Sequence, residues 1–151
     1  MAKLGEMLPE MLAARGIAVA FCAPGPAAVE LLRGVSQPGA RLVANRTATG
    51  AGAMAEGHAR ATGAPAAVLA SGGRGLVTLA PAIAHARACS TPMLVLTTGD
   101  GRGADCEAAL RRAGLSDLGE ALALSSRRVA SGPALAEALD EAAARFAADA
   151  P

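Results

Sequence analysis

The sequence predicts an α/β fold with a doubly wound, mostly parallel sheet of about five or six strands and helices on both faces. Short apolar segments alternate along the chain with longer segments in which apolar residues recur at helical spacing. Glycine or proline stands between most of these segments. The chain has 151 residues, a length that suits one core, so we expect residues 1–151 to form a single domain.

The first elements are a helix, a strand and a turn. Leu and Met recur at i, i+3 and i+4 spacing over residues 4–12, and they predict one face of a helix that ends at Gly16. Ile17–Cys22 is a short apolar run and predicts a strand. Pro24–Gly25–Pro26 then predicts a tight turn into a helix over 27–33.

The next predicted helix is rich in glycine. Residues 41–44 predict a second strand, and residues 47–62 predict a helix that stops at Gly63. The interior of this helix holds Gly50, Gly52 and Gly57. Each glycine costs about 1 kcal/mol relative to alanine, so we expect another part of the molecule to approach this helix closely.

A glycine-rich segment follows the third predicted strand. Residues 66–70 predict that strand, Ser71–Gly75 a loop, and residues 76–88 a helix. The loop stands at the carboxyl end of a strand, where open α/β sheets bind ligands. It matches neither the P-loop nor the dinucleotide-binding pattern. It is therefore either a plain turn or a ligand-binding loop of another kind.

The last segments continue the alternation of strand and helix. Residues 93–97 predict a strand, and residues 106–113 predict a helix after a loop. Residues 122–129 predict a last short strand. Residues 133–148 predict an alanine-rich helix with its leucines on the inner side.

Composition and charge exclude several classes of protein. A formal net charge of +1 and a pI of about 7.8 leave no basic stripe for nucleic acid. With two Phe and no Tyr or Trp, the chain lacks base-stacking platforms and aromatic cages. The most apolar stretch, residues 76–96, is interrupted by His85, Arg87 and Pro92, so we expect no membrane segment.

The cysteines and histidines give no sign of a disulfide framework or a metal site. Cys22, Cys89 and Cys106 are odd in number and widely spaced, and the amino terminus lacks the order of a signal peptide. We therefore expect a cytoplasmic protein in which each cysteine is a small buried hydrophobe. We identify no Cys, Asp or Glu partner at ligand spacing for His58 or His85, so we expect each histidine to be packed or to lie at the surface.

The segment Met54–Gly63, with the sequence MAEGHARATG, carries a more specific signal. It resembles the helix with the pattern MA-acid-G-aromatic-AR-x-TG in the pyrimidine-binding domain of thiamine-diphosphate enzymes, such as acetolactate synthase and 2-oxo acid decarboxylases. Four other segments are similar to that family in the same order, namely Leu4–Ile17, Phe21–Gly25, Ser71–Gly75 and Thr91–Gly99. The resemblance covers nearly the whole chain, from about residue 3 to 148.

The resemblance implies that this chain holds one half of a cofactor. In the family, thiamine diphosphate lies between a pyrimidine-binding domain and a diphosphate-binding domain, and the second domain also holds Mg²⁺. We expect the diphosphate-binding domain to be absent here and to be supplied in trans by a partner chain that carries the Mg²⁺. The residues implied to bind the cofactor are Pro24, Gly25, Ala48, Ser71, Gly73, Arg74, Gly75 and Thr78.

Two features depart from the family pattern. The family's catalytic glutamate, which hydrogen-bonds a ring nitrogen of the aminopyrimidine, falls on Ala48, so no catalytic residue is assigned. Gly99–Asp100–Gly101 is similar to the family's metal motif but occupies the place of another segment, and the only asparagine, Asn45, precedes it. We therefore expect no metal ligand in this chain.

The resemblance implies a subunit of a decarboxylase or carboligase that acts on a small 2-oxo acid, and three accounts stay open. The chain is one subunit of a split enzyme similar to sulfopyruvate decarboxylase, or it uses chemistry without the glutamate as in glyoxylate carboligase. The third account is a catalytically silent scaffold or regulatory homologue. A homo- or hetero-oligomer is expected in each case, through the face of Gly50, Gly52, Ala53 and Gly57; alternatively, these glycines pack only against the chain's own sheet. Arg46 is the ionisable residue nearest in sequence to position 48, and our hypothesis is that it contacts an acidic substrate.

Overall fold

The molecule is built on a parallel sheet of four strands. The computed structural model describes residues 4–23, 25, 38–98 and 106–148. The strands lie in the order β2-β1-β3-β4, and their bounds are β1 (Val19–Cys22), β2 (Arg41–Ala44), β3 (Ala66–Ser71) and β4 (Met93–Thr98). All neighbouring pairs are parallel. The predicted α/β class is thus confirmed, with four strands in the described residues where about five or six were expected.

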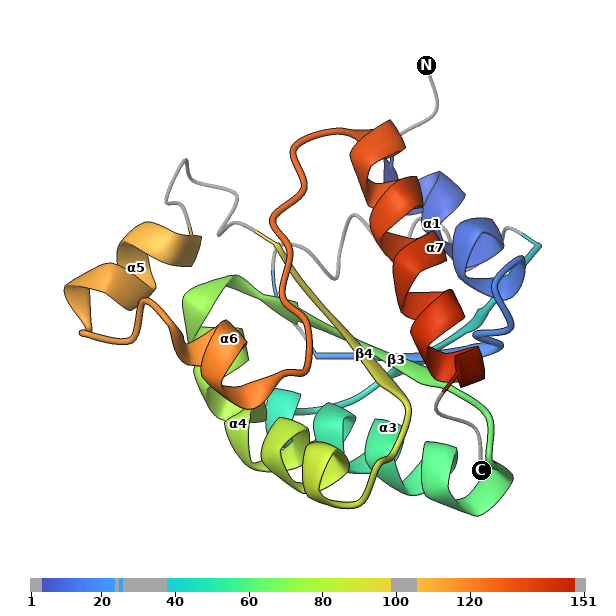
Figure 1. Ribbon diagram of the computed structural model, residues 1–151, viewed down its shortest axis with the longest axis horizontal. Helices are drawn as coiled ribbons and strands as arrows, with labels where there is room; N and C mark the ends of the chain where they lie inside the picture. The colour runs from blue at the N-terminus through green and yellow to red at the C-terminus, as the bar shows by residue number, and fades with distance from the viewer. Residues whose placement is uncertain (1–3, 24, 26–37, 99–105, 149–151) are drawn as a thin grey trace.

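Helices cover both faces of this sheet (Figure 1). One face carries α1 (Leu4–Ala13) and α7 (Gly132–Ala148), and the other carries α3 (Ala48–Thr62) and α4 (Gly72–Ala88). Two short helices, α5 (Cys106–Arg112) and α6 (Leu118–Leu122), pack beside α4. Within these described helices, none combines the length and the apolar character needed to span a bilayer. The helix predicted over 27–33 lies outside the described residues.

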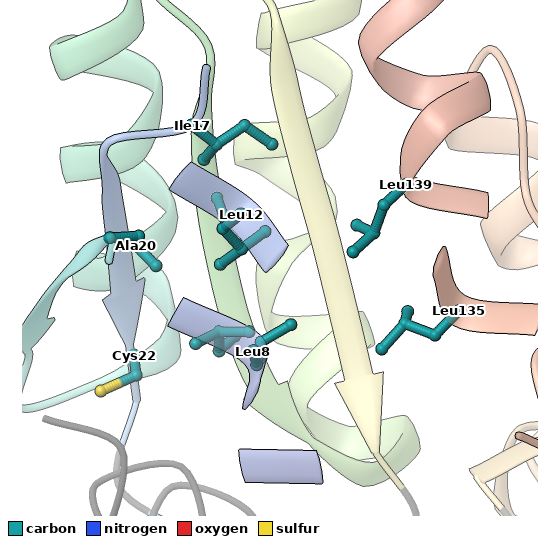
Figure 2. Packing of buried hydrophobic residues seen from close by; sticks show 10 residues of the cluster. Leu8, Leu12, Ile17, Ala20, Cys22, Leu135 and Leu139 are labelled. Carbon is teal, nitrogen blue, oxygen red and sulfur yellow. The ribbon is translucent and has the colours of Figure 1, made fainter. Parts of the chain in front are cut away.

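Each strand sends alternate side chains to the two faces, as a pleated sheet requires. In β3, for example, Ala67 and Leu69 point to the α1/α7 face, whereas Ala66, Val68 and Ala70 point to the α3/α4 face. The core on the α1/α7 face consists of Leu8, Leu12, Ile17, Ala20, Cys22, Ala40, Ala67, Leu69, Leu135 and Leu139. In the view of Figure 2, Leu8 and Leu12 of α1 and Leu135 and Leu139 of α7 lie on the two sides of β4.

The core on the α3/α4 face is built mainly from alanine. Its members are Phe21, Ala23, Ala51, Ala55, Ala59, Ala66, Val68, Ala70, Leu79 and Ile83. Because most of these side chains are single methyl groups, the helices must lie close to the sheet and to each other to exclude water. A Cβ placed on Gly52 would lie 2.8 Å from Leu79 Cδ2 and 2.9 Å from Ala82 Cβ. The expected close approach to the glycine-rich helix is therefore confirmed at Gly52, where the approaching element is α4, but not at Gly57, where no atom lies within 4 Å of an added Cβ.

The segment Ser71–Gly75 is not a loop, which corrects the prediction from sequence. Ser71 is the last residue of β3 and α4 begins at Gly72, with Gly72, Gly73 and Gly75 inside the helix. Gly72 has φ +65°, which turns the chain from strand to helix within one residue. A Cβ on Gly75 would lie 2.8 Å from Ala70 Cβ, so the absent side chain lets α4 start directly against the end of its own strand.

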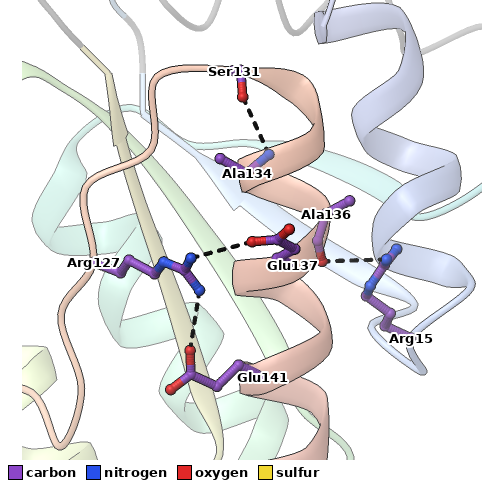
Figure 3. Close-up of polar contacts among 7 residues, drawn as sticks. All are labelled: Arg15, Arg127, Ser131, Ala134, Ala136, Glu137 and Glu141. Carbon is purple, nitrogen blue, oxygen red and sulfur yellow. Dashed lines mark hydrogen bonds and ion pairs between the residues drawn. The ribbon is translucent and has the colours of Figure 1, made fainter.

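The strand predicted over 122–129 is also wrong. Residue 122 ends α6, and the following residues up to 131 form an irregular segment. The side chain of Arg127 lies between two carboxylates of α7, 3.3 Å from Glu137 Oε2 and 3.4 Å from Glu141 Oε2 (Figure 3). These contacts hold the segment against α7 instead of in register with β4. The charged and polar run Ser125–Arg128 also has no apolar alternation that would favour a strand.

The ends of α3 and α4 are closed by specific caps. Thr47 Oγ1 accepts a hydrogen bond from Gly50 N (3.0 Å) at the start of α3, and Gly63 ends this helix in the left-handed conformation. At the end of α4, Thr91 N donates to Ala86 O (2.8 Å) and Ser90 N donates to Arg87 O (3.3 Å). This pair of bonds is a Schellman motif, with Ser90 at φ 50° in the place that glycine usually takes.

We predict opposite effects for two alanine substitutions in α3. Gly52→Ala should lower the free energy of unfolding by about 1–3 kcal/mol, because the new methyl group must displace Leu79 or Ala82. Gly57→Ala should raise it by about 0.5–1 kcal/mol, because no atom lies within 4 Å of the added Cβ and alanine favours the helix. Urea denaturation followed by circular dichroism measures both values. Equal effects of the two substitutions would contradict the α3–α4 packing described above.

Candidate functional site

The carboxyl ends of β1 and β3 form the topological switch point of the sheet. From β1 the chain passes to β2 on one side, and then crosses to β3 on the other side of β1. The connections therefore leave the carboxyl edge in opposite directions at β1 and β3. Open α/β sheets bind ligands in the crevice that is expected at such a switch point, and we refer to this place as the crevice.

Gly25 and Ser71 meet at this crevice. Ala23 N donates to Leu69 O (3.1 Å) and so extends the pairing of β1 with β3 beyond the end of β1. A Cβ on Gly25 would lie 2.9 Å from Ser71 Cβ and would also overlap its Oγ. Only glycine at position 25 lets the segments that follow the two strands come this close. Pro24, the other residue expected in this turn, lies outside the described residues.

Two long helices begin at the same edge of the sheet. The α3 helix follows β2 after the short segment Asn45–Thr47, and α4 follows β3 directly. Asn45 is held in place through its backbone N, which donates to Cys22 O (2.8 Å), and its side-chain Nδ2, which donates to Val43 O (3.1 Å). Helix starts present backbone N–H groups that have no partner within the helix. The edge thus offers hydrogen-bond donors and small side chains.

Ala48 is the first residue of α3 and is half-buried. Its methyl group packs against the alanine-rich core of the α3/α4 face. A methyl group cannot accept or donate a proton. At this position the chain contributes shape and a backbone N–H, and no acid or base.

The other predicted cofactor residues lie in the first two turns of α4. Gly73 and Gly75 are buried, and Gly75 serves the contact with β3, whereas Arg74 is exposed. Thr78 lies one turn further along, where its Oγ1 donates to Arg74 O (2.7 Å). The structure therefore brings Gly25 and Ser71 together and places Ala48 and Gly73 at the same edge. The role of each residue in binding stays a prediction.

The described residues at this edge carry positive charge only. Arg46 lies between β2 and α3, Arg74 lies in the first turn of α4, and both side chains are exposed. In the described part of the chain, no group of three or more His, Cys, Asp or Glu side chains could hold a metal ion. The segment Gly99–Asp100–Gly101 lies outside that part.

A large cleft lies elsewhere, along the free edge of β4. It has a volume of about 1300 Å³ and is lined by β4, α6, α7 and the irregular segment that follows α6. Gly25, Ala48 and Ser71 are not among its lining residues. The cleft is therefore lined by other residues than the switch point, and it lies on the side of β4 where the described residues place no further strand.

The cysteines and histidines differ from expectation in two places, at Cys89 and at His85. Cys22, the last residue of β1, is buried as expected, and burial raises the pKa of its thiol. Cys89 is exposed, so the expectation that it is buried is wrong. His85 has two partners that we did not identify from the sequence. Its Nδ1 lies 3.1 Å from Glu56 Oε1, and its Nε2 lies 3.9 Å from Cys89 Sγ. The i, i+4 spacing of His85 and Cys89 was the available signal.

Comparison with known proteins identifies the family. Residues 2–112 match the family described as "Thiamine pyrophosphate enzyme, N-terminal TPP binding domain". A 79-residue stretch is 39% identical to the probable 2-ketoarginine decarboxylase AruI of Pseudomonas aeruginosa, and it covers 52% of this chain but only 14% of that protein. The region that matches the family, residues 2–112, includes Gly25, Ala48, Ser71 and both helices that begin at the crevice. The chain therefore belongs to the thiamine pyrophosphate enzymes and contains their N-terminal, pyrimidine-binding domain.

Proposed function

We propose that this chain is the pyrimidine-binding half of a two-chain, thiamine-diphosphate-dependent decarboxylase or carboligase that acts on a 2-oxo acid. A partner chain holds the diphosphate and Mg²⁺. The observation that carries the proposal is the crevice between β1 and β3, where Gly25 and Ser71 meet inside the region that matches the family. When bound, thiamine diphosphate supplies the electron sink for making or breaking a bond beside a carbonyl carbon.

The residues at the crevice suit a flat, neutral ring. Gly25, Ala48 and the glycines of α4 leave room for close approach of a ring face, and the helix starts supply N–H donors for ring nitrogens. The described residues at this edge include no acidic side chain. The chain therefore fits the binding and orientation of the aminopyrimidine but not the donation or removal of its proton.

The side chain at position 48 determines how fast we expect proton transfer at the aminopyrimidine ring to be. General acid–base help from one positioned side chain is worth about 10²–10⁴ in rate. With a methyl group in this place, proton transfer at the ring depends on water or on the partner chain. The same observation supports a second candidate function, a scaffold or regulatory subunit that keeps the fold without catalysis.

The charges at the crevice favour an acidic substrate. Arg46 and Arg74 are exposed guanidinium groups at the carboxyl edge. They attract the carboxylate of a 2-oxo acid and disfavour a second positive charge, such as the guanidinium of 2-ketoarginine. The similarity to a probable 2-ketoarginine decarboxylase therefore supports the reaction class more than that particular substrate.

We predict that this chain binds thiamine diphosphate only together with a diphosphate-binding partner. Calorimetric titration of the cofactor with Mg²⁺ should give no binding heat with this chain alone, because the described residues include no group of His, Cys, Asp or Glu side chains that could hold the Mg²⁺. With the partner present, one cofactor should bind per pair of chains. The partner alone serves as the control. If the mixture binds no more cofactor than the partner alone, the scaffold function is favoured instead.

We predict that Ala48→Glu increases turnover of the two-chain enzyme by about 10²-fold or more, because it supplies the missing proton acceptor. The first turn of α3 tolerates a carboxylate, since the helix dipole favours negative charge there. The matched control is Thr49→Glu, which adds the same charge at an exposed neighbouring position. Carbon dioxide release from a 2-oxo acid measures both variants. Equal rates for the two variants would show that position 48 does not face the ring.

We predict that Arg46→Ala raises the KM for a 2-oxo acid with a second carboxylate by about tenfold, which is the loss of one charge-assisted hydrogen bond. The matched control is Arg41→Ala, since Arg41 is an exposed arginine at the opposite, amino end of the same strand. Steady-state kinetics of the two-chain enzyme give both KM values. A KM that does not change in the Arg46 variant would remove this residue from substrate binding.

A further inference from the structure

Three side chains form a row from the middle of α3 to the end of α4. Glu56 comes from α3, His85 from the last turn of α4, and Cys89 from the cap that ends α4. Glu56 Oε1 lies 3.1 Å from His85 Nδ1, and His85 Nε2 lies 3.9 Å from Cys89 Sγ. The carboxylate side chain is only 13% exposed, whereas the imidazole is 55% exposed and the thiol is open to solvent. The row therefore runs from the packed side of the helix pair out to the surface.

The hydrogen bonds fix the tautomer of His85. A carboxylate only accepts hydrogen bonds, so the proton of the neutral imidazole lies on Nδ1, facing Glu56. The lone pair of Nε2 is then directed toward Cys89 and can accept the thiol proton. Arg60 Nη1 lies 3.5 Å from the same oxygen of Glu56 and adds a second contact that holds this carboxylate in position. A base beside a nucleophile, oriented by a third group, is the arrangement that activates thiols in proteins.

The end of α4 holds Cys89 in line with His85. The Schellman bonds from Ser90 and Thr91 fix the backbone on both sides of the cap. His85 is one turn earlier on the same helix, so the two side chains lie on the same face.

The surroundings of Cys89 give access to an anionic reagent. Cys89 lines the mouth of the cleft along β4 together with Arg60 and Arg87. Arg87 is anchored through a hydrogen bond from Nη1 to Ala121 O (2.9 Å). Both arginines thus belong to the lining of the cleft that Cys89 also lines, and Arg60 Nη1 lies 3.5 Å from Glu56 Oε1. A small molecule that carries carboxylates is therefore attracted to this part of the surface.

We propose that Cys89 is a modification site that forms a mixed disulfide with a small, anionic disulfide, and that this reaction is independent of the cofactor site. His85 Nε2 takes the proton of the Cys89 thiol, and the sulfur attacks one sulfur of the reagent. The S–S bond of the reagent breaks as the new S–S bond forms, and the released thiolate takes the proton from His85. One disulfide is consumed and one is formed, so the electrons balance.

Cys22 provides an internal comparison. It is buried at the end of β1, and burial raises the pKa of its thiol. Thiols react as thiolates, so Cys22 should stay unmodified while the protein is folded.

The test treats the full chain with glutathione disulfide and follows the modification of each cysteine by mass mapping of peptides. In the wild-type protein, Cys89 should react about tenfold faster than the same cysteine in a synthetic peptide of residues 83–92, because the peptide lacks Glu56 and the folded geometry. Cys22 should remain unmodified. If Cys89 reacts no faster than the peptide, the proposal is overturned, and this comparison needs no variant.

Two variants test the role of the row itself. His85→Gln keeps a polar side chain without a base, and Glu56→Gln keeps the shape without the charge; each should slow the reaction of Cys89 by about tenfold. The matched control is His58→Gln in α3, a histidine whose ring lies against Phe21 and should not affect the rate. Thermal unfolding confirms that each variant is folded. Unchanged rates in both His85 and Glu56 variants would overturn the role assigned to them.

Discussion

Close contact between backbones, made possible by alanine and glycine at the packing positions, is the constraint on which this structure depends. The chain has two Phe and no Tyr or Trp, so large side chains cannot fill the space between layers. On the α3/α4 face the layers are separated mainly by methyl groups, and glycine stands where even a methyl group would overlap a neighbour. The same constraint acts at Gly52 between the helices, at Gly75 between α4 and β3, and at Gly25 at the crevice. The packing of the layers and the shape of the candidate site therefore both depend on the high content of alanine and glycine.

Much of the fold could be predicted because local signals and tertiary packing agree. The α3 helix runs from Ala48 to Thr62, one residue inside the predicted range, because Thr47 and Gly63 supply caps that are visible in the sequence. The errors occur where tertiary contacts decide the outcome. The glycines after Ser71 suggested a loop, but their absent side chains let a helix start against β3. Residues 122–129 suggested a strand, but Arg127 is held by two carboxylates of α7.

The candidate site, like the fold, could be predicted from the sequence only where local motifs determine it. The turn at Gly25 and the position of Ala48 follow from motifs and their spacing, whereas the contact between Gly25 and Ser71 depends on the order of the strands. The row of Glu56, His85 and Cys89 joins two helices through residues that are 29 positions apart, which no local pattern indicates. The family relationship accounts for the architecture of the crevice. It does not account for the side chain at position 48, where this chain has a methyl group.

The order of the strands also determines how local motions are distributed. Among the described strands, β1 and β3 have hydrogen-bonded neighbours on both sides, and β3 is almost entirely buried. In contrast, β4 has a neighbour on one side only and is half-buried, next to a segment that is held by exposed ion pairs. Local opening costs least where few buried contacts are lost. Local opening along β4 and the cleft beside it therefore costs less free energy than opening between β1 and β3. Fluctuations of β4 can then occur while the arrangement of β1 and β3 stays unchanged.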